Sequence, residues 1–337
     1  MDTSSDPGLR VPRTSVLINN YNHAPFLRHC LDSVLGQSLR PHEVVVVDDG
    51  STDESLEILR SYGDAIRLIA LAHGTGTPIE NQARAILEGF RASTGEILFL
   101  LDGDDAFLPG KIATYVRAFM EAPDAVMVQA PLEKIDETGR TLGLEFETAR
   151  HQQDYLAHIY AEHELNIYYP TSALAFTRAY LDRHLPVDLS DRRPIWPDAR
   201  LALIAPHFGR VIALSRPYTQ WRRHSRSHTV ARPLSVYQLV RLNQAYFNAF
   251  CRRNRKPTIT PWKSHYHRLR WLKHHLIPAR LFHWYRIVRW ATLNEEKRRR
   301  LLAGPDSAEI DRELARVARQ MLPPSPFEGS DPARTHR

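Results

Sequence analysis

Over the first 130 residues, short apolar segments with strand character alternate with segments of helical periodicity. Strands that alternate with helices of about 10 to 15 residues are typical of βαβ units around a mostly parallel sheet. A run of four valines at residues 44–47 indicates that this sheet is buried on both faces. The sequence therefore predicts an α/β fold with strands at residues 14–18, 43–47, 66–70, 96–101 and 125–130, and helices at residues 25–35, 53–62, 79–92 and 109–121.

Three of these predicted strands are each followed directly by a cluster of polar residues. The clusters are NNYN at residues 19–22, DDGS at residues 48–51 and DGDD at residues 102–105. In an open parallel sheet, ligands bind in the crevice beyond the carboxyl ends of the strands. A turn or a helix cap would explain one such cluster equally well, but three clusters on one edge favour a binding site.

The segments NNYN, VVDDGSTD and LLDGDD, in this order and spacing, closely resemble the motifs of family 2 glycosyltransferases over about residues 13–230. The resemblance implies a GT-A fold, which is a Rossmann-like, mostly parallel sheet flanked by helices. It also implies an inverting enzyme that transfers a sugar from a nucleotide-diphosphate sugar, expected to be a UDP-sugar, to an acceptor hydroxyl in cell-surface polysaccharide or glycolipid synthesis. By the same resemblance the donor would be bound by Asn20, Tyr21, Asp48, Asp49, Gln82, Asp102, Asp104 and Arg223, and Mn²⁺ or Mg²⁺ by Asp104, Asp105 and His224.

The chemistry of the residues agrees with this assignment. A diphosphate leaving group accumulates negative charge, which a hard cation stabilises, and carboxylates are suitable ligands for such a cation. The sequence departs from the family pattern at Asn19, where the family most often has proline, and at Leu87, where it usually has asparagine. Gln82, Gly89 and Gly95 fit the pattern, so the departures leave the donor sugar open but not the fold.

Residues 194–209 read PIWPDARLALIAPHFG, and Asp198 occupies a position that resembles the catalytic base of the family. The alternative is that Asp198 only satisfies the N-terminus of a helix after Pro197. Residues 220–229, QWRRHSRSHT, resemble a motif that closes over the diphosphate, with Arg222 or Arg223 on the phosphate oxygens and His224 on the metal. A solvated basic strand end explains this segment about as well.

The basic residues of the chain are concentrated in one segment. Residues 252–300 carry fifteen Lys or Arg against two Asp or Glu. The cationic and aromatic residues of the segment 262–300 indicate either an interfacial surface for anionic lipid or a helical subdomain with a basic outer face. The chain is predicted to begin with a flexible N-terminus at 1–12, followed by a glycosyltransferase domain at 13–230. This domain has a nucleotide-binding half (13–130) and an acceptor-side half (131–230), which contains a hairpin at 133–147. A mainly helical C-terminal extension at 231–322, with a helix at 234–254, and a disordered tail at 323–337 complete the predicted division.

No segment approaches the roughly 18 to 20 apolar residues of a transmembrane helix, and the N-terminus lacks the apolar region of a signal peptide. Cys30 and Cys251 have no zinc or disulfide spacing. These features predict a cytoplasmic protein, peripheral at the inner face of the plasma membrane, with a glycan or lipid-linked acceptor as partner. Nucleic acid is not expected as a partner because the basic segment has no recognition motif.

Two other functions remain open from the sequence. A nucleotidyltransferase would also use Mg²⁺ and carboxylates, but it would usually have a glycine-rich basic loop where this chain has NNYNHAPF. The other alternative is a nucleotide-sugar-binding module without catalysis. A glycoside hydrolase would need paired carboxylates around the sugar and would have no use for a nucleotide site.

Overall fold

The computed structural model describes residues 10–145, 154–165, 168–225, 227, 236–260 and 263. Within this part of the chain, a seven-stranded sheet has the order β10-β6-β9-β4-β1-β2-β3. The strands are β1 (Thr14–Asn20), β2 (Glu43–Asp48), β3 (Arg67–Ala70), β4 (Ile97–Asp102), β6 (Ala125–Gln129), β9 (Leu174–Thr177) and β10 (Arg210–Ala213). Neighbouring strands are parallel except at β9, which is antiparallel to both β4 and β6. The predicted α/β fold with a mostly parallel sheet is confirmed.

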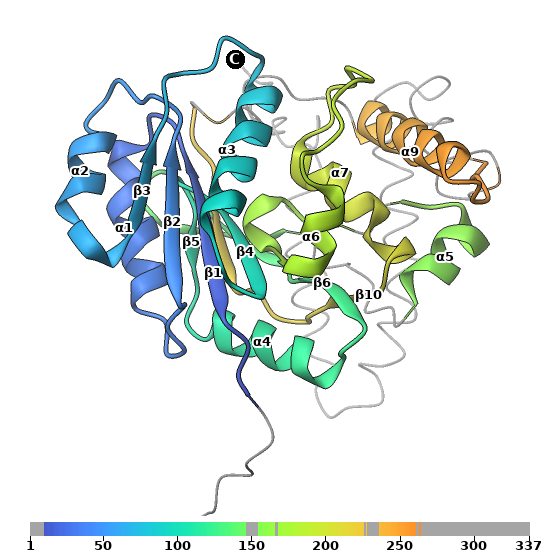
Figure 1. Cartoon of the computed structure of the whole chain (residues 1–337), viewed down its shortest axis with the longest axis horizontal. Coiled ribbons are helices and arrows are strands. Elements are labelled where there is room, and N and C mark those ends of the chain that lie inside the picture. Colours follow the sequence, from blue (N-terminus) through green and yellow to red (C-terminus); the bar gives the residue numbers. More distant parts are fainter. Residues whose placement is uncertain are drawn as a thin grey trace, which may run out of the picture. The chain divides into compact units, whose positions relative to one another are not determined.

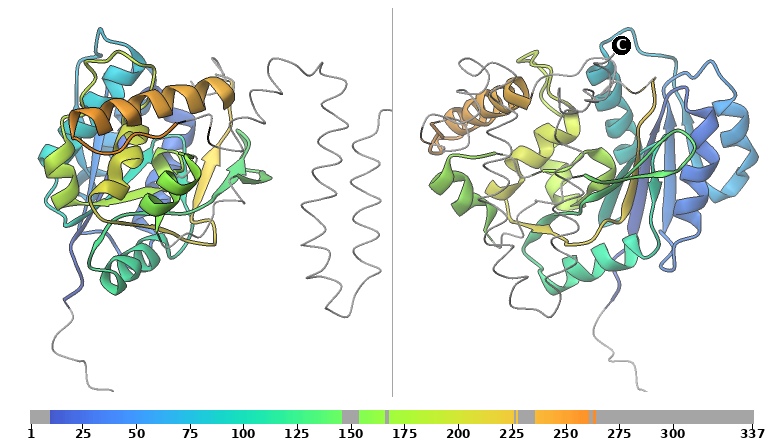
Figure 2. Two further views of the ribbon diagram at one scale, coloured as in Figure 1. Left: turned by 90° about the vertical axis from the view of Figure 1, so that its right-hand side faces the viewer. Right: turned by 180° about the vertical axis from the view of Figure 1, so that it is seen from behind.

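Helices cover both faces of this sheet, as Figures 1 and 2 show from opposite sides. Because side chains alternate along a strand, Val16 and Ile18 of β1 contribute to one core and Leu17 to the other. The first core contains side chains of α1, α2 and α4, and the second contains side chains of α3, α5, α6, α7 and α9. The helices are α1 (Ala24–Leu35), α2 (Ser55–Ser61), α3 (Pro78–Ala92), α4 (Lys111–Glu121), α5 (Tyr155–Glu162), α6 (Arg178–His184), α7 (Pro197–Ile204) and α9 (Val236–Arg253), with 3₁₀ turns η1 (Gly63–Ala65), η2 (Thr171–Ala173) and η3 (Ala205–His207).

Helix α3 shows how local sequence fixes these elements. Thr77 and Glu80 form a capping box at its start, in which the Glu80 amide donates to Thr77 Oγ1 and the Thr77 amide donates to Glu80 Oε2. Near its end, a Cβ atom on Gly89 would lie 3.4 Å from Val47 Cγ2, so a glycine lets the helix approach the sheet closely. The helix is thereby held with its N-terminus, and with it Gln82, near the carboxyl ends of the strands.

A second, four-stranded sheet has the order β5-β11-β7-β8. Its strands are β5 (Ala106–Phe107), β7 (Leu132–Ile135), β8 (Thr141–Glu145) and β11 (Thr219–Arg222). β7 and β8 are antiparallel and form the predicted hairpin. β11 lies between β5 and β7, and it therefore returns a late segment of the chain to the loop that follows β4.

The elements predicted for the first 130 residues are all present, with ends within two residues of the prediction. The predicted helix at 234–254 corresponds to α9. Residues 1–9, the tail at 323–337 and the segment 262–300 apart from Lys263 lie outside the described residues, so the predicted domain boundaries remain predictions. Of the helices that the structure describes, none combines the length and the apolar character needed to cross a membrane.

Candidate active site at the carboxyl ends of the strands

The strand register brings the three polar clusters together on one edge of the main sheet. Asn20 at the end of β1 is opposite Asp48 at the end of β2, and Asn19 is opposite Asp102 at the end of β4. Residues from three neighbouring strands therefore border one site. The site extends from the loops after β1 and β2 to the start of α7.

Asp48 and Asn20 organise the loop after β2. Asp48 is fully buried, and its Oδ1 accepts from Asn20 Nδ2 at 2.7 Å and from Ser51 Oγ at 2.6 Å. Its Oδ2 accepts from the Ser51 amide at 2.9 Å. Ser51 Oγ in turn accepts from the amide of Asn22 at 2.9 Å. Asp48 thus contributes to the site by fixing the β1 and β2 loops to one another.

Asp49 faces a histidine that the sequence did not single out. His73 Nδ1 lies 3.0 Å from Asp49 Oδ2 and 2.8 Å from the Asp49 carbonyl oxygen. The His73 ring stacks on Tyr21 with 4.3 Å between ring centroids, and Arg84 lies 3.8 Å from Asp49 Oδ1. His73 follows β3 as the other site residues follow their own strands, and that position is the signal that could have identified it.

Gly50, next to Asp49, can be tested directly because it has φ +72° and a Cβ atom there would collide with the backbone of His73. Replacing Gly50 with alanine is expected to lower the free energy of unfolding by about 2–5 kcal/mol, from backbone strain and overpacking together. Gly63→Ala is the control, since Gly63 has φ +50° but open space around its Cβ position. Denaturant unfolding measures both variants, and equal losses would show that contact with His73 does not matter.

Gln82 and Asp102 lie together at the centre of this edge. Gln82 Nε2 donates to Asp102 Oδ1 at 3.3 Å, across from helix α3 to strand β4. Burial, and then the charges of Asp104 and Asp198, raise the pKa of Asp102 to about 8. Asp102 therefore lies close enough to both of these carboxylates to sense their charge, which connects the two sides of the site.

Asp104, His224 and His23 form a group that could hold a metal ion, since one ligand atom from each lies within 4.8 Å of the others. His224 Nε2 is 2.8 Å from Asp104 Oδ2, and His23 Nε2 is 4.0 Å from it. Burial raises the pKa of Asp104, but the two histidines outweigh it and hold that pKa below its usual value. His23 begins helix α1 directly after the NNYN cluster, and sequence reasoning missed it.

Asp105 is also a predicted metal ligand, and both oxygens of its carboxylate accept hydrogen bonds from the protein. Its Oδ1 accepts from the Arg222 amide at 2.8 Å and its Oδ2 from Ser172 Oγ at 2.5 Å. Burial, followed by the charges of Asp104 and Asp102, raises the pKa of Asp105 well above its usual value. Asp105 therefore anchors the loop after β4 through its hydrogen bonds, whereas the neighbouring Asp104 belongs to the metal group.

The guanidinium of Arg222 is bound within the protein. It donates to the carbonyl oxygens of Asp104, Asp136 and Glu137, and it lies 2.9 Å from His29 Nδ1. The same group stacks 4.8 Å from the ring centre of Phe26. Arg222 therefore joins β11 to the β4 loop, the hairpin and α1, and it holds the next residues of the chain against the site.

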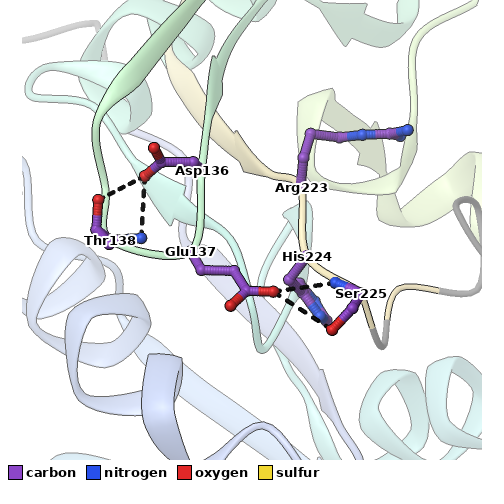
Figure 3. A pocket seen from close by; sticks show the side chains of 6 residues that line it. All are labelled: Asp136, Glu137, Thr138, Arg223, His224 and Ser225. Carbon is purple, nitrogen blue, oxygen red and sulfur yellow. Dashed lines mark hydrogen bonds between the residues drawn. The ribbon is translucent and has the colours of Figure 1, made fainter.

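Arg223 and His224 line an open pocket of about 480 Å³ together with Ser225 and the hairpin residues Asp136, Glu137 and Thr138. Figure 3 shows Arg223 extending away from the hydrogen-bonded pair of Glu137 and Ser225. The Arg223 guanidinium lies 4.7 Å from the ring of Trp221. The pocket meets the metal group at His224 and extends from it toward the hairpin, whereas the other predicted donor residues do not line it.

Asp198 is the second residue of α7 and is 5% exposed. Its Oδ2 accepts from Thr171 Oγ1 at 3.0 Å, while its Oδ1 is buried without a hydrogen-bond partner. Burial raises the pKa of Asp198, and the amide of Ala199 and the Thr171 hydroxyl oppose that shift. The charge of Asp198 also contributes to the raised pKa of Asp102, so the two carboxylates lie within electrostatic range of each other.

Solved structures share this fold at low sequence identity. TarS residues 1–349 of S. aureus, solved with UDP-GlcNAc, is 20% identical with a TM-score of 0.52, and the match covers 69% of this chain and 66% of that one. The mannosyltransferase PcManGT of Pyrobaculum calidifontis, solved with GDP-Man and Mn²⁺, is 20% identical with a TM-score of 0.52 over 96% of this chain and 84% of that one. The architecture described above is therefore of the GT-A type.

Sequence comparison gives relatives that are named as glycosyltransferases. An uncharacterized glycosyltransferase of Nostoc sp. is 31% identical over 217 residues, which are 63% of this chain and 65% of that protein. The putative glycosyltransferase EpsH of Bacillus subtilis is 28% identical over 136 residues, 40% of this chain and 38% of that protein. The matches thus span less than two thirds of the length of either relative. Residues 15–184, half of the chain, match the family model described as Glycosyl transferase family 2, and the chain belongs to that family.

Proposed function

We propose that this protein is an inverting glycosyltransferase that moves a sugar from a nucleoside diphosphate sugar, with a UDP-sugar as the first candidate, to an acceptor hydroxyl. One observation carries the proposal. Buried polar atoms are nearly always hydrogen-bonded in native proteins, yet Asn20 Oδ1, Asp49 Oδ1, Gln82 Oε1, Asp198 Oδ1 and His224 Nδ1 are buried without a hydrogen-bond partner. All five atoms belong to residues at the candidate site, where a polar ligand would complete them, although such atoms also occur away from it, in His184, Asn243 and Gln244.

Asp49 and Tyr21 suit the nucleotide base and ribose. Asp49 offers an unsatisfied carboxylate oxygen, and Tyr21 offers a ring that already stacks on His73. Asn20, Asp48, Gln82 and Asp102 would complete the nucleotide side by position, with Asp48 acting through the loop that it holds. The neighbour TarS was solved with UDP-GlcNAc and PcManGT with GDP-Man, which supports a nucleoside diphosphate sugar as the donor class.

The metal group fits a divalent cation in its donor set. Asp104 supplies a carboxylate oxygen, His224 and His23 supply imidazole nitrogens, and small side-chain adjustments would bring all three onto one ion. This mixture favours Mn²⁺ over Mg²⁺, because imidazole is a softer ligand and Mg²⁺ strongly prefers oxygen. When bound, the cation would stabilise the negative charge of the diphosphate leaving group. Arg223, beside His224, would add a positive charge on the diphosphate side.

Asp198 would be the general base. In an inverting displacement, the acceptor oxygen attacks the anomeric carbon opposite the leaving diphosphate. The acceptor proton passes to Asp198 Oδ1 as the new glycosidic bond forms, and the electron pair of the broken bond leaves on the diphosphate oxygen. The buried position of Asp198 supports this role, since burial raises its pKa toward the range in which a carboxylate is an effective base.

The acceptor is proposed to be a glycan or a lipid-linked glycan in cell-surface polysaccharide or glycolipid synthesis. The pocket between the β7–β8 hairpin and residues 223–225 borders the metal group and is proposed as the approach for this acceptor. An association of residues 262–300 with anionic membranes belongs to the same proposal, and flotation of the protein with anionic vesicles at low and high salt tests it.

A panel of nucleotide sugars tests the proposed function. The protein is incubated with UDP-GlcNAc, UDP-glucose, GDP-mannose and related donors, with and without Mn²⁺, and release of the nucleoside diphosphate is followed. Metal-dependent release from at least one donor is expected, at first with water as acceptor. If no donor is bound and none is cleaved, the protein is not a glycosyltransferase of this kind.

The nucleotide side is tested by Asp49→Ala. The substitution removes a carboxylate acceptor for the base or ribose, and a hydrogen bond to a charged group is typically worth about 10- to 100-fold in affinity. Titration calorimetry with UDP and GDP is expected to show this loss in the dissociation constant. Asp64→Ala, at an exposed acid in η1, is the control and should bind as the wild type does. Unchanged affinity of Asp49→Ala would remove Asp49 from the nucleotide site.

A further inference from the structure

The 3₁₀ turn η2 connects the two chemical halves of the site through consecutive hydroxyl groups. Thr171 Oγ1 donates to Asp198 Oδ2 at 3.0 Å. Ser172 Oγ, the next hydroxyl, donates to Asp105 Oδ2 and accepts from the Asp102 amide at 3.1 Å. We propose that Thr171 is a positioning residue that orients the general base Asp198. The same turn also fixes the loop of residues 102–105 through Ser172. This inference rests on the function proposed above.

The turn is suited to this role because the protein holds it from several directions. The Ser172 carbonyl oxygen accepts from Lys111 Nζ at 2.5 Å and from Thr219 Oγ1 at 3.0 Å. The Ala173 carbonyl oxygen accepts from Tyr115 Oη at 2.8 Å. Thr171 and Ser172 are 4% and 1% exposed, so water does not compete for these bonds. The Thr171 hydroxyl therefore has a defined position, because the backbone of η2 is fixed by these bonds.

Asp198 needs an external partner because its own helix offers a competing one. It is the second residue of α7, where a carboxylate is attracted by the unpaired amides of the first turn. The Thr171 hydroxyl adds a bond to Oδ2 from outside the helix, beside the contribution of the Ala199 amide, and Oδ1 has no hydrogen-bond partner. Oδ1 is therefore the oxygen proposed to take the proton of the acceptor.

The same turn sets the separation between base and leaving group. Thr171 fixes Asp198, and Ser172 fixes Asp105, which lies next to Asp104 of the metal group. With water as acceptor, the water oxygen bonds to the anomeric carbon, its proton moves to Asp198 Oδ1, and the bond from that carbon to the diphosphate oxygen breaks. Thr171 takes no part in bond making, so its effect should be confined to the rate of this step.

Thr171→Val tests the inference, because valine keeps the size and branching of threonine and removes only the hydroxyl. We expect kcat for nucleoside diphosphate release from the best donor of the panel to fall about 10- to 100-fold, the value of a hydrogen bond to a charged group. The dissociation constants for UDP and Mn²⁺ should stay at their wild-type values. Thr171→Ser should restore kcat, since it restores the hydroxyl.

Ser93→Ala is the matched control. Ser93 is 6% exposed and its hydroxyl donates to the Phe90 carbonyl oxygen at 2.8 Å, just before β4 begins and far from the carboxyl edge. The Ser93→Ala substitution removes a buried hydroxyl that does not bond to Asp198, so kcat of this variant should equal that of the wild type. Thermal unfolding of each variant shows how much folded protein contributes to the measured rate.

The outcomes separate this inference from the proposed function. If the wild type releases the nucleoside diphosphate and Thr171→Val keeps the wild-type kcat, the positioning role is wrong while the proposed function stands. A loss of kcat that follows a loss of nucleotide or Mn²⁺ binding, or a failure of Thr171→Ser to restore it, also overturns the role. If the wild type cleaves no donor, both the proposed function and the inference fail.

Discussion

Replacing Asp104 with asparagine is expected to abolish Mn²⁺ binding and to lower metal-dependent turnover by about 10³-fold. Asp104 supplies the only carboxylate among the three residues of the metal group in the described part of the chain. A cation on a leaving group contributes several kcal/mol to transition-state stabilisation, and each 1.4 kcal/mol is tenfold in rate. Equilibrium dialysis with Mn²⁺, followed by electron paramagnetic resonance, measures the binding, and diphosphate release measures the turnover.

Asp105→Asn provides the comparison. Its carboxylate accepts from Arg222 and Ser172 rather than facing the two histidines. We expect this variant to unfold at a lower temperature, because one of two buried acceptors is replaced by a donor, but to bind Mn²⁺. If instead Asp105→Asn loses the metal and Asp104→Asn keeps it, the roles of the two residues are the reverse of those proposed.

The second large effect is expected at Asp198. Asp198→Asn keeps the shape and the bond to Thr171 but cannot accept a proton, so turnover should fall about 10²- to 10⁴-fold, the typical contribution of a general base. UDP and Mn²⁺ should bind with wild-type affinity, because Asp198 lies on the acceptor side. Asp182→Asn, at an exposed carboxylate of α6, is the control. Wild-type turnover in Asp198→Asn would show that the base lies elsewhere.

The pH profile gives an independent check of Asp198. The base must be ionised, and burial raises its pKa, so turnover should rise with pH through a value above the usual pKa of aspartate, about 3.9. The pKa of Asp102 is also raised, to about 8, and Asp102 likewise loses its proton as the pH rises, so it can contribute to the same limb of the profile. The acidic limb can therefore be assigned to Asp198 only if it disappears in Asp198→Asn.

The sequence predicts the centre of the main sheet well because β1, β2 and β4 are buried on both faces. Such strands are continuous apolar segments, and the loops after β1, β2 and β4 carry polar residues that no core would need. The acceptor-side half is different, since β9 and β11 are four residues long and owe their positions to distant partners. Local periodicity cannot reveal an antiparallel strand inserted between β4 and β6.

The site shows the same limit at the level of single residues. His224 was predicted at the metal from its motif, and the structure brings it together with Asp104 and His23. His23 and His73 were missed because a histidine after a strand has no local pattern that separates a ligand from a surface residue. The sequence gives the order of Asp104 and Asp105 but not the hydrogen bonds of their side chains, such as those of Asp105 with Arg222 and Ser172.

The path of β11 has a consequence for how the protein acquires its activity. Asn20 and Asp48 of the nucleotide side are 28 residues apart in the chain, whereas Asp104 and His224 are 120 residues apart. Contacts between distant segments carry a larger loss of chain entropy and tend to form late in folding. A nascent chain could therefore complete its nucleotide loops well before it can hold a metal ion. Under the proposed function, cleavage of the donor would then require synthesis of the chain at least as far as His224.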